Sequence, residues 1–289
     1  EDLEQLGKVA DRVRTYAVDP GLDLVPSLAN KNGLKVSLGL WLSDVVELNE
    51  KQIKRGIEVI KQNPDVIDRV FVGNEAVLRG ELTALEVGEY IMRVKKAIPK
   101  NIPVGTADVW SVWLKYPELA KYSDFIGIHL LPYWEGIKAQ DSMAYIENRF
   151  AMVKKSFPKK PVVIAEAGWP SEGRVKRGSV PSPAMQAYFL RHFLTLAEAE
   201  SYDYYIIEAF DQPWKAEQEG AVGAFWGLFD AEGQPKFGFT GQLSSFNQWK
   251  DYAVVAVFLT LLFSSIVFAL LPLVSVRGYI LVGVVINLT

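Results

Sequence analysis

Seven apolar runs rich in β-branched and aromatic residues alternate with amphipathic stretches, and this alternation constrains the fold more than any other feature of the chain. Repeated βα units of this kind build a parallel sheet covered by helices. The apolar runs are residues 12–18, 35–42, 69–75, 102–108, 125–131, 162–168 and 204–211. The main helical patterns are residues 49–62, 83–97, 142–157 and 182–201. The sequence therefore predicts an α/β fold.

The number and spacing of the runs favour a barrel. A (β/α)8 TIM barrel takes about 250 residues and eight strands. This chain offers seven strands in that length and opens on a helical pattern at residues 1–10. An open doubly wound sheet usually carries a glycine-rich phosphate loop after its first strand, and the corresponding segment here, YAVDPGLD, is not one. We expect a (β/α)8 TIM barrel lacking its first strand in this chain, formed by residues 1–242.

The composition changes sharply after residue 251. The 25 residues 252–276 carry no charge, which is enough for a helix to cross a hydrocarbon core of about 30 Å. Residues 243–251 are expected to form a linker, 252–276 a transmembrane helix, and 277–289 the start of a second membrane segment. A buried core helix is the alternative. If Arg277 marks the cytoplasmic flank, the barrel is membrane-anchored and lies in the periplasm or outside the cell.

Composition also excludes several kinds of chemistry. The net charge of -3 argues against a nucleic-acid partner, because such proteins usually present a basic field. The chain has no Cys and only two His, too few for most zinc sites. We therefore expect no metal and no cofactor. His129 and His192 are interpreted as packing residues, and the chemistry is expected to come from carboxylates.

Aromatic residues follow the predicted strand ends, where parallel barrels place their functional residues. Six of the eight Trp fall there. Flat aromatic faces give sugar C–H groups a large apolar contact, and polar groups on the same rim can bind the hydroxyls. Packing of loops against the barrel is the alternative for any one of them. The six are Trp41, Trp110, Trp113, Trp134, Trp169 and Trp214.

Two acids stand out by position. Glu75 ends the third run after Asn74, and Glu166 lies near the end of the sixth run. Both are expected to point into the barrel mouth, where two carboxyl groups about 5 Å apart can carry out retaining glycoside hydrolysis. The charge of Glu166 is expected to keep Glu75 protonated near neutral pH as the general acid.

Five motifs resemble bacterial members of glycoside hydrolase family 17 over about residues 1–240. They are VGNEAVLRG at 72–80, HLLPYWEG at 129–136, IAEAGWPSEG at 164–173, EAFDQPWK at 208–215 and GAFWGLFDAEGQPKF at 223–237. In that family the acid/base ends barrel strand four and the nucleophile ends strand seven. Here the matching residues end the third and sixth runs, an offset that agrees with the missing strand.

The resemblance implies roles for individual residues. Glu75 matches the acid/base, Glu166 the nucleophile, and Asn74 a neighbour that contacts the reacting sugar. Tyr133 matches an aromatic residue that hydrogen-bonds the nucleophile. The remaining residues expected to bind substrate are Trp110, Trp134, Trp169, Glu208, Trp214 and Lys215. A rim ion pair is the alternative for Glu208 and Lys215.

The expected activity is a retaining glycoside hydrolase or transglycosylase acting on β-1,3-linked glucan, with a β-glucan polysaccharide or oligosaccharide as its partner. The membrane segment also resembles that of bacterial relatives that continue into a fused family 2 glycosyltransferase. The alternative is a non-catalytic, membrane-tethered glucan-binding module that uses the same Trp rim.

Overall fold

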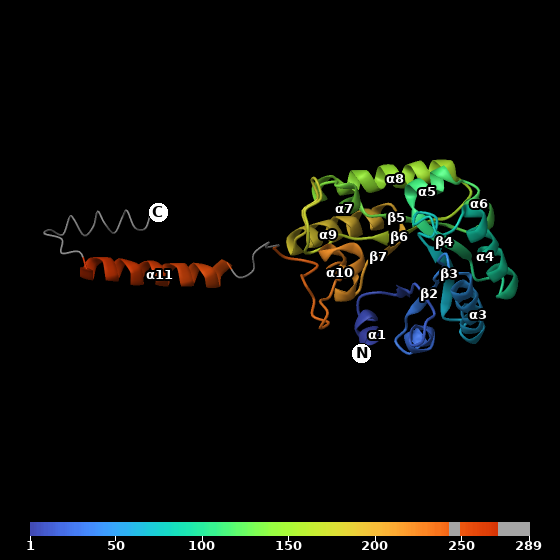
Figure 1. Ribbon diagram of the computed structural model, residues 1–289, viewed down its shortest axis with the longest axis horizontal. Helices are drawn as coiled ribbons and strands as arrows, with labels where there is room; N and C mark the ends of the chain where they lie inside the picture. The colour runs from blue at the N-terminus through green and yellow to red at the C-terminus, as the bar shows by residue number, and fades with distance from the viewer. Residues whose placement is uncertain (243–248, 271–289) are drawn as a thin grey trace. The chain divides into compact units, whose positions relative to one another are not determined.

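The computed structural model describes residues 1–242 and 249–270, and these fall into two compact units, residues 1–243 and 244–289. The first unit holds one sheet of seven parallel strands in the order β1-β2-β3-β4-β5-β6-β7. Figure 1 shows the strands inside a layer of helices. The strands are β1 (Arg12–Arg14), β2 (Lys35–Leu40), β3 (Ile67–Asn74), β4 (Val104–Val109), β5 (Ile126–Leu130), β6 (Val162–Ala167) and β7 (Asp203–Ile206).

Each predicted run overlaps one of these strands, so the nearly closed, TIM-barrel-like sheet is confirmed. The first and last strands are shorter than the runs 12–18 and 204–211. Strands β1 and β7 are the two edges of the sheet and do not pair with each other. Side chains cross between them instead, because Arg12 Nη1 lies 2.9 Å from Asp203 Oδ1.

The helices lie between the strands as the sequence predicts. Their starts follow ordinary capping chemistry: Thr83 and Glu86 form a capping box, and the Ser182 hydroxyl accepts from the Met185 N–H. The longer ones are α3 (Val46–Gln62), α4 (Ala84–Ala97), α8 (Ser142–Ser156) and α9 (Pro183–Ala199). Shorter helices are α1 (Asp2–Leu6), α2 (Val25–Asn30), α5 (Trp110–Lys115), α6 (Leu119–Tyr122), α7 (Pro132–Glu135) and α10 (Ala216–Glu219), with 3-10 turns η1 (Leu22–Leu24), η2 (Ala139–Asp141), η3 (Pro213–Lys215) and η4 (Ala221–Ala224).

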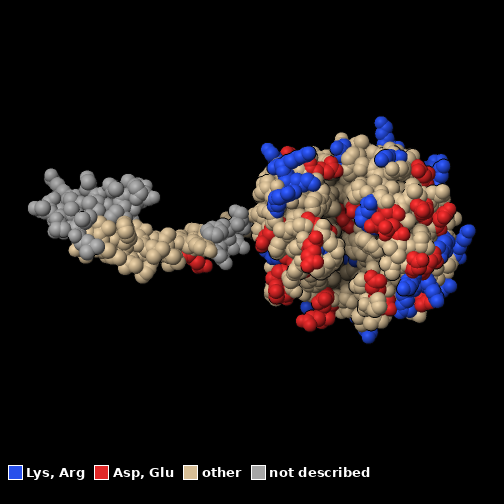
Figure 2. Space-filling view, viewed as in Figure 1, with Lys and Arg blue, Asp and Glu red and all other residues tan. Residues whose placement is uncertain are grey.

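Alternation along the strands divides the buried side chains into two sets. The larger set packs between the sheet and the helices. The smaller set fills the inside of the barrel and consists of Phe71, Ala107, Phe125, Val163, Ala165 and Tyr205. Figure 2 shows a groove on one face of this unit with acidic side chains in it.

The second unit contains helix α11 (Trp249–Leu270). Its segment Trp249–Val267 is long and apolar enough to cross a membrane by length and composition. Val254 is 69% exposed and Phe258 is 64% exposed, so this apolar face is not buried in the structure. The predicted helix 252–276 is therefore helical as far as residue 270. The rest of that prediction, the segment 277–289 and most of the linker lie outside the described residues.

Candidate active site

Glu75 stands at the first position after β3, in a backbone conformation that aims its side chain at the barrel axis. Gly73 has φ +84° and Glu75 itself has φ +54°. A left-handed conformation at a non-glycine residue costs about 1–3 kcal/mol, and such residues gather at functional sites. The Glu75 N–H donates to the Ala107 carbonyl on β4 at 2.8 Å, which fixes the turn.

Arg79 holds the same turn from the other side. Its guanidinium donates to the Asn74 carbonyl and, at 2.8 Å, to the Leu42 carbonyl. It also lies 4.4 Å from the ring centroid of Trp41, which is 37% exposed. The backbone that carries Glu75 is thus tied to the loop after β2.

Glu166 lies on β6, and its side chain is only 6% exposed. Its Oε1 accepts a 2.8 Å hydrogen bond from the Tyr16 hydroxyl. Arg14 Nη1 lies 3.3 Å from the same oxygen and 2.7 Å from the Ala165 carbonyl. Arg14 Nη2 donates to Asn74 Oδ1 at 2.5 Å. One buried guanidinium therefore orients Glu166 and also Asn74, the residue before Glu75.

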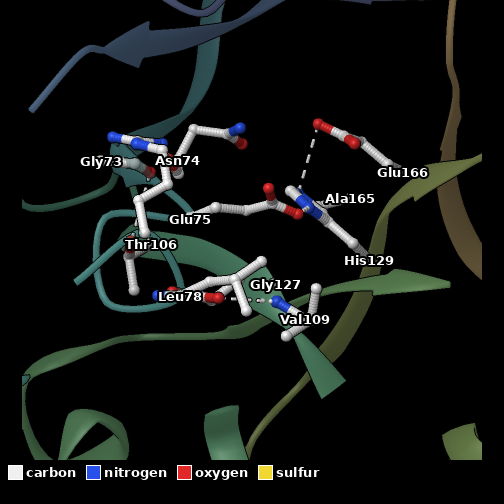
Figure 3. A network of polar contacts seen from close by, with 12 residues as sticks. Gly73, Asn74, Glu75, Leu78, Thr106, Val109, Gly127, His129, Ala165 and Glu166 are labelled. Atoms are coloured by element: carbon white, nitrogen blue, oxygen red, sulfur yellow. Dashed lines mark hydrogen bonds and ion pairs between the residues drawn. The ribbon is translucent and has the colours of Figure 1, made fainter. Parts of the chain in front are cut away.

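His129 on β5 lies between the two acids (Figure 3). Its Nδ1 is 2.6 Å from Glu75 Oε1, and its Nε2 is 3.4 Å from Glu166 Oε1. One oxygen of each carboxylate and one ring nitrogen lie within 4.8 Å of one another. The interpretation of His129 as a packing residue is therefore wrong. The alternation of Gly127 and His129 with Ile126, Ile128 and Leu130 was the available signal, because a period of two places His129 inside the barrel.

The charges around Glu75 act on its protonation. Burial alone raises the pKa of Glu75, but the charge and hydrogen bond of His129, with Arg79 and Arg14, lower it overall. Burial alone lowers the pKa of His129, and the carboxylates of Glu166 and Glu75 raise it overall. Both directions favour a charged Glu75 beside a charged His129.

Glu208 and Lys215 follow β7 and form a buried pair. Lys215 Nζ lies 2.9 Å from Glu208 Oε2, and Gln212 donates to the same oxygen at 2.6 Å. Burial raises the pKa of Glu208 to about 7, although Lys215 opposes this shift. Among the described residues, nothing hydrogen-bonds Glu208 Oε1. Because the side chains are 10% and 14% exposed, this is not a solvated rim pair.

The aromatic residues separate into two groups. Trp214 is 58% exposed, and Trp110 and Trp134 are half-buried. Trp110 Nε1 donates to Glu135 Oε1 at 2.9 Å, and Trp134 stacks on the buried Trp226. These three can offer ring surface to a ligand.

Trp113 and Trp169 are fully buried, so the expectation that they line the rim is wrong. Trp113 Nε1 donates to the Gly127 carbonyl, and Trp169 Nε1 donates to the Val180 carbonyl. Tyr133 is also buried, and its hydroxyl donates to the Arg174 carbonyl at 2.6 Å. The hydrogen bond to Glu166 that was expected from Tyr133 comes from Tyr16, on the segment that follows β1.

Glu75, His129 and Glu166 are also the residues that come closest to a metal-binding group in the described part of the chain. Their geometry fits a cation poorly. Arg14 already places a positive charge 3.3 Å from Glu166 Oε1, and His129 Nδ1 is engaged with Glu75. The arrangement instead brings two carboxylates and a buried imidazole together.

Comparison with known proteins places this chain in a family. Residues 1–227 match the family model described as the BtgE/BtgC glycoside hydrolase domain. The Glucan 1,3-beta-glucosidase of Arthroderma benhamiae is 29% identical over 264 residues, which cover 82% of each chain. A probable family 17 glucosidase of Saccharomyces cerevisiae is 30% identical over 80% of this chain and 59% of its own length. These relatives are fungal, whereas the motifs had resembled bacterial members.

Solved structures of a family 17 enzyme also match this chain. The family 17 beta-1,3-glucanosyltransferase from Rhizomucor miehei superposes with a TM-score of 0.75 at 29% identity, over 83% of this chain and 89% of that one. An active-site mutant of that enzyme, in complex with laminaritriose, matches with the same TM-score at 28% identity, over the same shares of the two chains. This chain is a glycoside hydrolase that belongs to the BtgE/BtgC glycoside hydrolase domain family, and so to glycoside hydrolase family 17.

Proposed function

We propose that this protein cleaves or transfers β-1,3-linked glucan with retention of anomeric configuration. The observation that carries this proposal is the separation of the two acids. Retaining enzymes hold their carboxyl groups about 5–5.5 Å apart, and inverting enzymes about 6.5–9.5 Å apart. Oxygens of Glu75 and Glu166 lie within 4.8 Å of each other. That spacing leaves no room for the water that an inverting enzyme places between acid and base.

Glu166 is the proposed nucleophile. It attacks the anomeric carbon while Glu75 gives a proton to the leaving oxygen, and a glycosyl-enzyme ester forms on Glu166. Glu75 then removes a proton from the acceptor, which displaces Glu166. Tyr16 and Arg14 hold the Glu166 carboxylate in place. The fixed geometry favours attack, since it supplies orientation before the substrate arrives.

The substrate class follows from the relatives. One is named a glucan 1,3-beta-glucosidase, and a solved relative holds laminaritriose. In this chain Asn74 is the proposed contact of the reacting sugar. Trp110, Trp134 and Trp214 are the proposed stacking surfaces, and Glu208 with Lys215 supplies buried polar groups. Trp169 and Tyr133 support this set from the core.

The acceptor decides between hydrolysis and transglycosylation. Water gives an endo-β-1,3-glucanase, and a sugar hydroxyl gives a glucan transglycosylase. Both outcomes use the same Glu75 and Glu166, so both belong to one proposal. The competing function is a membrane-tethered glucan-binding module without turnover. The clustering of Glu75, His129 and Glu166 around a desolvated centre favours the enzyme, since a binding surface has no use for it.

Helix α11 supports a membrane anchor for the barrel. Its apolar residues are exposed, as a lipid-facing helix requires. We propose residues 1–242 as the hydrolase domain, 243–251 as a linker, 252–276 as the anchor and 277–289 as the start of a second membrane segment. The barrel then works outside the cytoplasmic membrane, in the periplasm or at the cell surface, and a fused family 2 glycosyltransferase supplies glucan in the full-length protein. Without residues 252–289, the protein is expected to be soluble in the absence of detergent and to keep the fold of the barrel.

The test compares Glu166→Gln and Glu75→Gln with Glu147→Gln, an exposed control on α8, using a laminarin-type β-1,3-glucan. Glu166→Gln should lower turnover by more than about 10⁴-fold. Glu75→Gln should lower it by about 10²–10⁴-fold on laminarin and far less on donors with good leaving groups. Retention is read from the anomeric configuration of the first product by NMR. Glucan binding by the wild-type protein without any turnover would assign the binding module instead. Full turnover in both Gln variants would remove Glu75 and Glu166 as the catalytic pair.

A further inference from the structure

His129 is the group at this centre that the proposed double displacement does not use. Its side chain is fully buried and bridges the two carboxylates, with 2.6 Å to Glu75 and 3.4 Å to Glu166. Its Nε2 makes no hydrogen bond among the described residues, although it lies at ion-pair distance from Glu166. A packing histidine would satisfy both nitrogens with neutral partners. This one faces an acid on each side.

We propose that His129 is a positioning residue that stores the catalytic proton between turnovers and passes it to Glu75 when Glu166 becomes glycosylated. This inference rests on the proposed function of Glu75 and Glu166. It goes further, because it gives the acid/base a second proton site and couples that site to the state of the nucleophile.

The electrostatics support a proton on His129 in the resting enzyme. A buried charge needs partners, and this imidazole faces Glu75 from the end of β3 and Glu166 from β6. Asp108 on β4 adds a third acid, and its interaction with His129 is among the causes that shape its own pKa of about 6, after burial. Arg14 on β1 is the opposing cation. The carboxylates of Glu166 and Glu75 raise the pKa of His129 overall, against burial and the charge of Arg14, and so favour an imidazolium.

Glycosylation changes this balance. When Glu166 attacks, its carboxylate becomes an uncharged ester, and His129 loses one of the two anions that raise its pKa. The proton then moves across the 2.6 Å contact from Nδ1 to Glu75 as Glu75 protonates the leaving oxygen. The step converts imidazolium, two carboxylates and glycoside into imidazole, one carboxylate, glycosyl ester and free alcohol, so one negative net charge stands on each side.

The second displacement returns the proton to His129. Glu75 takes the proton of water or of an acceptor hydroxyl, the new C–O bond displaces Glu166, and the returning carboxylate draws the proton back to His129. No other co-reactant is needed. In this scheme Glu75 serves as acid and as base without having to remain protonated beside a charged Glu166.

The first test measures the protonation of His129 without replacing the residue. The chain contains only His129 and His192, so ¹⁵N-histidine labelling of the full chain in detergent gives two imidazole signals, and His192→Gln assigns them. We expect His129 to be an imidazolium at pH 7. In Glu166→Gln, which mimics the uncharged ester, its titration midpoint should fall by at least about one pH unit, since the pair interacts through a desolvated contact. Glu147→Gln should leave the midpoint unchanged. A neutral His129 at pH 7, or an unmoved midpoint in Glu166→Gln, overturns the proposal.

The second test reads the pH profile of kcat/KM. His129→Asn keeps a hydrogen-bond donor near Glu75 and lacks a proton that can be transferred, and His129→Gln is a second variant of the same kind. On laminarin both should lose about 10²-fold or more, and the basic limb should move to lower pH because Glu75 must then hold its own proton. On dinitrophenyl laminaribioside, which needs no acid, glycosylation should stay near the wild-type rate. His192→Gln is the matched control with wild-type behaviour.

The outcomes separate the two proposals. An active Glu166→Gln variant would remove the double displacement itself. An inactive Glu166→Gln, together with folded His129 variants that keep the wild-type basic limb or lose the same factor on every leaving group, would leave the double displacement standing and remove the proton store alone.

Discussion

Arg12 and Arg14 lie two residues apart on β1, and both reach across the barrel, yet they belong to networks of different character. Arg12 contacts Asp68 at 2.7 Å and Asp203 at 2.9 Å, and Arg69 contacts Asp203 at 2.6 Å. We call these four residues the edge cluster. The side chains of Arg12 and Asp203 are 35% and 40% exposed. Arg14 and Glu166, in the centre described above, are only 4% and 6% exposed.

The difference shows what burial adds to an ion pair. In the edge cluster two arginines face two aspartates, and water screens them, so the contacts bridge β1 and β7 without a surplus of either sign. At the centre, Glu75 and Glu166 both face the buried His129, whose side chain is 0% exposed beside the 6% exposed Glu166. Little water screens the contact between His129 and Glu166. Strand β1 thus supplies Arg12 to the edge cluster and Arg14 to the candidate active site.

The largest effect is expected from Arg14→Met, a change that roughly keeps the volume and removes the charge. Glu166 and Asn74 then lose a common partner, and breaking a buried pair costs about 3–5 kcal/mol. We expect kcat on laminarin to fall by about 10²-fold or more and the unfolding midpoint in urea to drop. Wild-type kcat in a folded Arg14→Met protein would show that Tyr16 alone orients Glu166, and that the two arginines do not differ as described.

The aromatic residues extend the comparison of buried with exposed groups. Trp169→Ala should destabilise the barrel by about 3–5 kcal/mol, since it empties a fully buried site beside Phe189. Trp214→Ala, at a 58% exposed position, should leave the free energy of unfolding within about 0.5 kcal/mol of wild type. It should instead raise KM for long glucans about fivefold. Thermal unfolding and KM measured on both variants decide the assignment, and the reverse pattern would return Trp169 to the rim.

Glu208 gives the centre a dependence of stability on pH. Burial raises its pKa to about 7 from an ordinary 4.5, so the folded state binds more protons than the unfolded state between these values. Stability from this group is therefore lost as pH rises from about 4.5 through 7, by up to about 3 kcal/mol. Glu208→Gln should flatten this slope in urea titrations at pH 5, 6 and 7. An equal slope in wild type and variant would place the titration elsewhere, with Asp108 the next residue to replace.

The fold could be predicted from the sequence because the apolar runs and the helical patterns are local signals. All seven runs became strands, and the third and sixth runs brought Glu75 and Glu166 together. Boundaries were less accurate at β1 and β7, where the chain leaves the sheet early. A run of apolar residues marks a segment that is buried, and it does not mark where pairing with a neighbour stops.

The errors for the aromatic residues have one physical origin, which is the direction of a side chain after a strand ends. Trp113, Trp169 and Tyr133 follow strand ends in sequence, but α5, the segment after β6 and α7 turn them into the core, where their N–H and O–H groups meet backbone carbonyls. Tyr16 lies beyond β1 and was not singled out, yet its hydroxyl reaches Glu166. The protonation of Glu75 also depends on His129, which the sequence does not place beside it because the two residues lie at the ends of different strands.

The smallest effect is expected from Arg12→Met, the matched partner of Arg14→Met. Its contacts to Asp68 and Asp203 are partly exposed, and ion pairs of that kind contribute about 1 kcal/mol or less. Arg69 remains beside Asp203, and Asp68, which is 20% exposed, keeps the 2.7 Å hydrogen bond from the Ser37 hydroxyl. We expect a loss in the unfolding free energy of at most about 1 kcal/mol, reduced further in 0.5 M salt by screening, and wild-type kcat, KM and pH profile. A shifted pH profile in Arg12→Met would mean that the two networks are coupled through β1, and that the proton balance at His129 extends to the other end of the barrel.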